Sequence, residues 1–186
     1  MQKKSFWVIL ALTLVLGLAL IGCNNGTTNT WSVITNINQL DGTWTFTLTE
    51  STTLQQEFGE YWDADLQAFF GNITITASIT MTFTINATTK VASETMTMTL
   101  TFSGGNIATQ SVWDEIKDEF GEDGATFNDQ QKSITWTESE GPAVMDDDEI
   151  EEVLNSGIQI SGNGKQIKFP AGMFGYQSPE MIFTKQ

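Results

Sequence analysis

Apolar and polar side chains alternate along most of residues 72–102. Apolar side chains occupy every second position from Ile73 to Ile85, with threonine or serine between them. After a polar break at residues 86–90, the alternation with threonine returns over residues 96–102. A period of two residues is typical of a strand with one apolar face and one solvated face. The stretch therefore predicts a long antiparallel hairpin.

Shorter segments predict the remaining strands of the same sheet. Trp44, Phe46 and Leu48 alternate with threonine within residues 41–50. Further segments with strand character are residues 132–138, 157–161, 165–170 and 180–185. With the hairpin they make seven strands, and residues 125–128 are the candidate for an eighth. The sequence therefore predicts a mostly β protein.

A helical segment is expected between the first strand and the hairpin. Within residues 51–71 the alternation stops and apolar side chains fall near helical spacing. Thr53 with Gln56 is suited to cap the start of this segment, and Gly71 its end. We expect its aromatic stripe to pack on one end of the sheet, either as a fixed plug or as a mobile cover. The rings expected to be buried there are Phe58, Trp62 and Phe69.

Gly59 is expected to divide this segment into two short helices. Residues 111–120 predict another helix, with Ser111 as its cap. Residues 146–155 predict a further one, because four consecutive acids favour an amino-terminal turn through the helix dipole. The predicted architecture is thus an antiparallel sheet with short helices between its strands.

The start of the chain has the organisation of a leader. Lys3 and Lys4 precede an apolar segment that is short for a spanning helix, which needs about 20 residues, so we interpret residues 1–22 as a signal peptide. The leader ends in Leu-Ile-Gly followed by Cys23, which closely resembles the lipobox of bacterial lipoproteins. That resemblance implies a diacylglycerol thioether on Cys23, cleavage just before it, and anchoring to a membrane of the bacterial cell envelope.

Residues 24–30 are small and polar, and we interpret them together with the acylated cysteine as a tether over residues 23–30. The folded domain is expected to cover residues 31–186. Anchoring at the outer membrane or the cell surface is expected ahead of the inner membrane.

The first predicted strand opens with Gly42-Thr43-Trp44, after a turn at residues 36–40. This arrangement resembles the first motif of the lipocalins and the wider calycin superfamily. The resemblance implies an up-and-down β-barrel of about eight strands in which Trp44 closes one end. It also implies that a basic residue late in the chain lies across the tryptophan, and Lys185 is the candidate. A generic antiparallel sandwich is the alternative.

The alternation directs a set of large apolar side chains toward one interior. They are Phe46, Ile79, Met81, Phe83, Met96, Met98, Phe102 and Trp136. A barrel of about eight strands has room for one small ligand, and flexible methionines suit an adaptable apolar pocket. We therefore expect a lipid-anchored protein that binds a small apolar molecule. The alternative is a fully packed barrel that serves as an envelope structural or protein-interaction lipoprotein.

The charge of the chain narrows the range of functions. The 186 residues include 23 acidic residues, 8 lysines, and neither arginine nor histidine, for a formal charge of -15. Such a charge repels nucleic acid and anionic lipid headgroups. The chain also lacks the imidazole and guanidinium groups that most often serve catalysis at neutral pH, so we expect no enzyme and no cofactor. A single cysteine excludes an intrachain disulfide.

Carboxylates are concentrated in residues 138–152. Several carboxylate oxygens together suit calcium, but no stretch of the sequence fits the calcium loop of an EF-hand. A paired carboxylate site for glycoside hydrolysis would need two acids brought together across a cleft, and the sequence singles out no such pair. We expect a solvated acidic face and no metal site.

Overall fold

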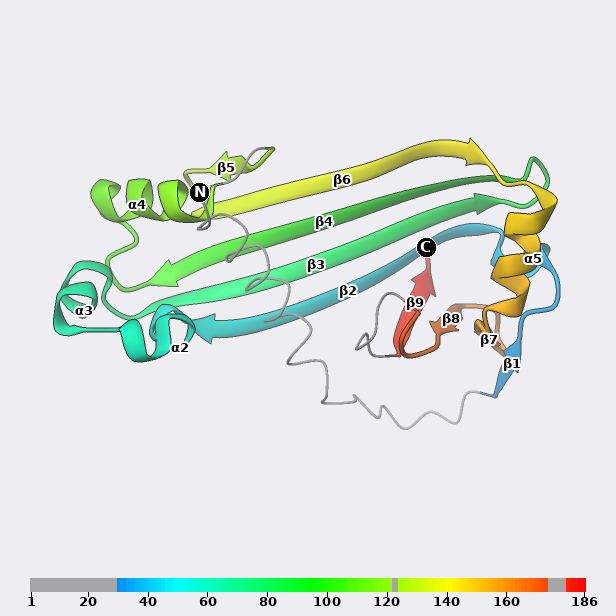
Figure 1. Ribbon diagram of the computed structural model, residues 1–186, viewed down its shortest axis with the longest axis horizontal. Coiled ribbons are helices and arrows are strands. Elements are labelled where there is room, and N and C mark those ends of the chain that lie inside the picture. Colours follow the sequence, from blue (N-terminus) through cyan, green and yellow to red (C-terminus); the bar gives the residue numbers. More distant parts are fainter. Residues whose placement is uncertain (1–29, 122–123, 174–179) are drawn as a thin grey trace. The chain divides into compact units, whose positions relative to one another are not determined.

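The computed structural model describes residues 30–121, 124–173 and 180–186. Over these residues the chain is mostly β, and nine strands form one antiparallel sheet in the order β1-β7-β8-β9-β2-β3-β4-β6-β5 (Figure 1). The strands are β1 (Trp31–Val33), β2 (Gly42–Thr53), β3 (Ile73–Asn86), β4 (Val91–Gly104), β5 (Thr126–Asn128), β6 (Ser133–Val144), β7 (Gln159–Ser161), β8 (Gln166–Phe169) and β9 (Met181–Lys185).

Short helices lie between these strands. They are the 3₁₀ turns η1 (Ile37–Leu40) and η2 (Gly59–Tyr61), and the helices α2 (Leu54–Phe58), α3 (Ala64–Phe70), α4 (Gln110–Phe120) and α5 (Asp147–Asn155). All seven predicted strands and the candidate eighth are present. The additional strand, β1, is only three residues long and is too short to show a period.

The predicted closure of the sheet into a barrel is not confirmed. Closure requires β6 and β7 to pair, in addition to the observed pairing of β2 with β9. Instead, the two edges of β7 are taken by β1 and β8, and β5 pairs with the start of β6. The later part of β6 contains Pro142, which lacks a backbone N–H and is typical of an edge strand. The described sheet is therefore open.

The described chain forms two compact units. Unit 1 comprises residues 48–79 and 97–137, and unit 2 comprises residues 30–47, 80–96 and 138–186, each without the gaps given above. The four long strands β2, β3, β4 and β6 each contribute to both units. Each unit has its own apolar core.

The core of unit 1 is built around Trp113 of α4, whose side chain is fully buried. Its ring centroid lies 6.1 Å from that of Phe102 on β4. The helix begins at Gln110, one residue earlier than predicted. Ser111 therefore lies in the first turn and is not the cap, which is Thr109.

The first helical segment divides at Gly59 as predicted, because this residue adopts a φ of 54° that favours glycine. Thr53 and Gln56 form the predicted capping box at the start of α2, with hydrogen bonds of 3.2 and 3.0 Å. Phe58 and Trp62 pack half-buried against the core of unit 1.

The prediction for Phe69 is wrong, since 40% of this residue is exposed. Phe70, the next residue, turns to the core instead and is buried. The two rings meet edge to face at 4.9 Å between centroids. One step along a helix rotates a side chain by about 100°, so the two neighbours cannot share the buried face.

Unit 2 shows how the threonines of the alternation are used. Side-chain hydroxyls pair across β2 and β3, from Thr43 to Thr84 at 3.0 Å and from Thr45 to Thr82 at 3.3 Å. These pairs hold the two strands in a register that directs the intervening side chains to the other face. The buried side chains on that face include Trp44, which is fully enclosed.

Candidate functional site

Trp44 is fixed at the start of β2 by the turn that precedes it. Its indole Nε1 donates a hydrogen bond of 2.7 Å to the carbonyl oxygen of Leu40 in η1. That turn is itself closed by a capping box between Asn36 and Gln39. The buried polar atom of the indole is thereby satisfied, as burial requires.

Lys185 lies across Trp44, as predicted. The two residues are directly opposite in the antiparallel pairing of β2 with β9. The Lys185 Nζ lies 5.3 Å from the centroid of the Trp44 ring, within the range of a cation–π contact. Among the described residues, the side-chain hydrogen bond to the carbonyl oxygen of Leu40 comes from the Trp44 indole.

Gly42 allows this arrangement for two reasons. Its φ of 116° is one that other residues rarely adopt. A Cβ at this position would also lie 2.7 Å from Cε of Lys185. The end of the lysine side chain therefore lies where a Cβ would be, and a larger residue here would require it to shift.

Unit 2 contains a cavity of about 310 Å³. Its walls come from the β3–β4 hairpin, the end of β6, α5, β8 and β9, and Figure 1 shows α5 at the turn end of this hairpin. The lining is mostly apolar and includes Met81, Phe83, Ile85, Val153, Phe169 and Phe183. A cavity of this kind is suited to a small apolar molecule.

Three phenylalanines form one rigid wall of the cavity. The ring centroids of Phe83 and Phe183 lie 5.1 Å apart, those of Phe169 and Phe183 4.9 Å, and those of Phe83 and Phe169 5.6 Å. Phe46 supports this wall from behind, with its centroid 5.4 Å from that of Phe183. Tilted and edge-to-face contacts at these distances are favourable for aromatic rings.

Another part of the lining comes from α5, which is held at its start by two sets of contacts. Asp146 and Glu149 form a capping box with two hydrogen bonds of 2.9 Å. The Lys90 ammonium lies 2.6 Å from the Asp147 carboxylate. The hydrogen bond from Lys90 keeps the pKa of the Asp147 carboxyl below its ordinary value of 3.8. The ion pair with Lys90 attaches the start of the helix to the turn of the β3–β4 hairpin.

Acidic side chains are also part of the cavity lining. They are Glu94 on β4, Glu140 on β6 and Glu149 on α5. All three residues are exposed, and Glu149 is already engaged in the capping box. The mouth also has exposed apolar residues, among them Val144 at 72% and Met173 at 38%.

The eight predicted ligand-binding residues are divided by the fold. Met81 and Phe83 line the cavity, and Phe46 packs in the same core without lining it. Phe102 and Trp136 belong to the core of unit 1. Ile79, Met96 and Met98 are half-buried and are not part of the cavity lining.

Sequence reasoning missed two parts of the cavity, namely α5 and the carboxylates. Glu94 and Glu140 fall in phase with the apolar positions of β4 and β6, so the alternation contained a signal for their direction. Val153 of α5 also lines the cavity, but nothing local in the sequence places α5 against the hairpin. This contact depends on the tertiary structure.

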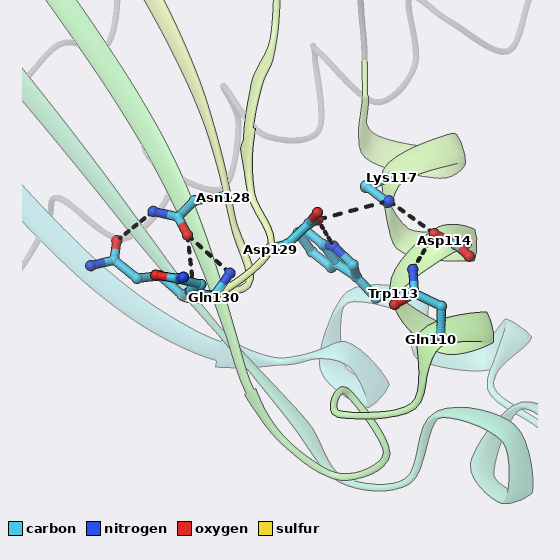
Figure 2. Close-up of polar contacts among 8 residues, drawn as sticks. Gln110, Trp113, Asp114, Lys117, Asn128, Asp129 and Gln130 are labelled. Atoms are coloured by element: carbon cyan, nitrogen blue, oxygen red, sulfur yellow. Dashed lines mark hydrogen bonds and ion pairs between the residues drawn. The ribbon is translucent and has the colours of Figure 1, made fainter.

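Unit 1 contains a polar network around Trp113, which Figure 2 shows. The indole Nε1 donates to Asp129 at 2.6 Å. Lys117 lies 2.9 Å from Asp114 and 3.8 Å from Asp129, and Gln110 donates to Asp114 at 2.8 Å. The network ties α4 to the loop between β5 and β6. We interpret it as structural, because each of these side chains has a polar partner within the network.

The acidic stretch at residues 138–152 does not gather into a metal site in the structure. Among the described residues, no three histidine, cysteine, aspartate or glutamate side chains come close enough to hold a metal ion. In the same part of the chain, no helix has the length and apolar character needed to cross a membrane. The signal peptide, Cys23 and the tether up to residue 29 lie outside the described residues.

No protein-family model, curated protein or solved structure matches the chain. The fold and the cavity define a mostly β protein with an open antiparallel sheet and one apolar cavity described in unit 2.

Proposed function

We propose that this chain is a lipid-anchored protein of the bacterial cell envelope that binds a small apolar molecule in the cavity of unit 2. The observation that carries the proposal is the cavity of about 310 Å³ with its wall of Phe83, Phe169 and Phe183. Ligand pockets typically measure about 300–1,000 Å³, so this volume favours a small ligand. The lipobox at Cys23 supports the anchoring.

We further propose that the sheet is an opened relative of the lipocalin-like barrel. Three features support this proposal: the pairing of β2 with β9, the Gly42-x-Trp44 start, and Lys185 over the indole. The opening is accounted for by β1, which occupies the edge of β7 that closure would use. In such a sheet the ligand would lie against the apolar face at the end marked by Trp44.

A fluorescence titration tests the binding of an apolar ligand. The neutral probe N-phenyl-1-naphthylamine is added to the chain from residue 24 onward, which keeps every described residue. Ala92 lines the cavity, so Ala92→Phe fills part of it and is expected to weaken binding by about tenfold or more. Ala68→Phe on exposed α3 in unit 1 is the matched control and should leave the affinity unchanged.

Equal affinities in the two variants would contradict binding in the cavity. Native mass spectrometry of the same protein gives an independent readout, because a bound molecule adds its own mass. Absence of both a bound molecule and a probe response would remove the proposal of ligand binding.

A second candidate function, protein interaction, is favoured by a different observation. In unit 1, Tyr61 and Phe69 are exposed by 74% and 40% on the first helical segment. Exposed aromatic residues are common at protein interfaces. In this alternative the envelope lipoprotein meets another protein through this segment. The test is cross-linking in cells that express the wild type or the double variant Tyr61→Ser/Phe69→Ser. Loss of a cross-linked partner in the variant, with unchanged binding of the fluorescent probe, would favour protein interaction.

A further inference from the structure

Two carboxylates interrupt the apolar face that lines the cavity of unit 2. Along β4 the positions in phase with Met96 are apolar except for Glu94. Along β6 the positions in phase with Trp136 include Glu138 and Glu140, of which only Glu140 lines the cavity. An acidic residue at a position that the alternation assigns to the interior departs from the pattern of a packed core.

The hydroxyl contacts on the other face fix how these strands are paired. Thr95 contacts Ser139 at 3.3 Å, and Thr97 contacts Thr137 at 3.4 Å. The numbers rise on one strand as they fall on the other, so the strands are antiparallel and Glu94 stands opposite Glu140. Directly opposite residues have their Cβ atoms about 4.5–5.5 Å apart.

The described structure supplies no internal cation for this pair. In the part of the chain that the structure describes, the ion pairs of lysines are with other acids: Lys90 with Asp147, Lys117 with Asp114 and Asp129, and Lys168 with Glu180. Like charges placed opposite each other destabilise a sheet. A cation bound between the two carboxylates would remove this repulsion.

The geometry points to a ligand with an apolar body and a cationic head, which we infer to be a hydrophobic amine. Its body would lie against the wall of Phe83, Phe169 and Phe183. Its ammonium would lie between Glu94 and Glu140, which are exposed and leave the head partly hydrated. Charge complementarity with a chain of formal charge -15 further disfavours a fatty acid. This inference rests on the proposed function, because it names the ligand class of the same cavity.

Competition between three matched ligands tests this inference. Decylamine, 1-decanol and decanoate share one apolar chain and differ in the charge of the head. Each is titrated below its aggregation concentration against bound N-phenyl-1-naphthylamine, with the chain from residue 24 onward. We expect decylamine to bind at least about tenfold tighter than decanoate, with 1-decanol between them, and added salt to reduce the difference.

Two double variants separate the specific pair from the general charge. Glu94→Gln/Glu140→Gln removes the pair, and decylamine should then bind about as well as 1-decanol. Glu60→Gln/Glu152→Gln removes the same total charge from exposed residues that do not line the cavity and lie outside this face of β4 and β6, and the order of affinities should remain. Both variants are compared by circular dichroism for retained folding.

The outcomes separate the inference from the proposed function. If 1-decanol binds and decylamine has no advantage over decanoate, the amine inference is overturned while apolar binding stands. If the probe does not bind and none of the three ligands binds, the proposed function fails. Calcium binding to the wild type that Glu94→Gln/Glu140→Gln abolishes, measured by calorimetry without any amine, would assign the pair to a metal and overturn the inference.

Discussion

Three neighbouring residues hold the end of unit 2 in one arrangement. Trp44 is buried and donates to Leu40, Lys185 lies over its ring, and Gly42 leaves room for the lysine stem. The glycine has two separable roles, since its φ is positive and its missing Cβ avoids a contact. Each role has a distinct energetic signature.

Gly42→Ala is expected to destabilise the protein by more than Gly164→Ala. Both glycines have positive φ values, of 116° and 67°, so both variants strain the backbone, by roughly 1–3 kcal/mol, and the strain is larger at 116°, which lies outside the left-handed helical region. Only the Cβ at position 42 meets another group, Cε of Lys185 at 2.7 Å, whereas nothing lies within 4 Å of the Cβ at position 164. Urea unfolding measures the free energy of each variant.

Lys185→Ala provides the second half of this cycle. It removes the stem that the new Cβ meets, so Gly42→Ala should cost less in the Lys185→Ala background than in the wild type. An equal cost in both backgrounds would show that the lysine does not lie over Gly42.

At the scale of elements, α5 depends on its attachment to the β3–β4 hairpin. Its own sequence supplies the capping box at Asp146, but the ion pair from Asp147 to Lys90 crosses 57 positions of the chain. The pair is exposed to solvent, and such pairs contribute little individually. Its value as a probe is that its contribution depends on pH in a defined direction.

Asp147→Asn is expected to lower the midpoint of thermal unfolding at neutral pH but not in acid. The pKa of Asp147 is lowered in the folded state by the hydrogen bond from Lys90, so its stabilising contribution is present above the ordinary value of 3.8. The contribution is lost as the pH falls through the lowered pKa. Calorimetry across this range should show the difference between wild type and variant disappearing toward low pH.

Asp148→Asn is the matched control for α5. It removes a charge from the same helical turn, and no ion pair of Asp148 is found among the described residues. The difference in unfolding midpoint between wild type and Asp148→Asn should not show the loss toward low pH that is expected for Asp147→Asn. A difference between wild type and Asp147→Asn that stays constant from neutral pH to well below the ordinary pKa would rule out the ion pair as its source.

At the scale of the whole molecule, the acidic chain and its proposed anchor have to act together. A formal charge of -15 gives the protein no attraction to an anionic membrane surface. Retention at a membrane would therefore depend on the acyl chains at Cys23. The cavity of unit 2 would then work in a protein held near a bilayer, where amphiphilic molecules are abundant.

Cys23→Ser should leave the protein without lipid and with its leader uncut. The hydroxyl of serine does not accept the diacylglycerol thioether that precedes cleavage in the lipoprotein family. Metabolic labelling with an alkyne analogue of palmitate, followed by gel electrophoresis, measures both lipid and size. Ser5→Ala in the leader is the control and should be labelled as the wild type is. Label on the Cys23→Ser protein would refute the interpretation of the lipobox.

Features that depend on residues close together in the sequence could be predicted, and most features that depend on distant residues could not. The β3–β4 hairpin was predictable because its alternation extends over many residues and its turn joins adjacent strands. The capping box of Thr53 and Gln56 was predictable because its atoms are three positions apart. The contact of Lys185 with Trp44 came from the family resemblance and from the pairing of the first and last predicted strands.

The open edge was not predictable in this way. β1 has three residues and no measurable period, yet it takes the edge of β7 that a closed barrel would need. Either β1 or β6 could pair with this edge of β7. The choice depends on the relative stability of pairings between distant segments, and the local sequence of neither strand predicts it. Phe69 and Phe70 illustrate the same limit, because both are apolar and only packing decided which ring is buried.

The sequence by itself determined the positions of every described strand except β1, the face to which their side chains point, and the strongly negative charge. These properties follow from local geometry and composition, with side chains alternating wherever a strand forms. Only the tertiary structure decided that the inward side chains are divided between two cores, and that α5 and the phenylalanines partly enclose a cavity with Glu94 and Glu140 at its wall. Enclosure requires surfaces from distant segments to meet, and its energy depends on how all of them pack together.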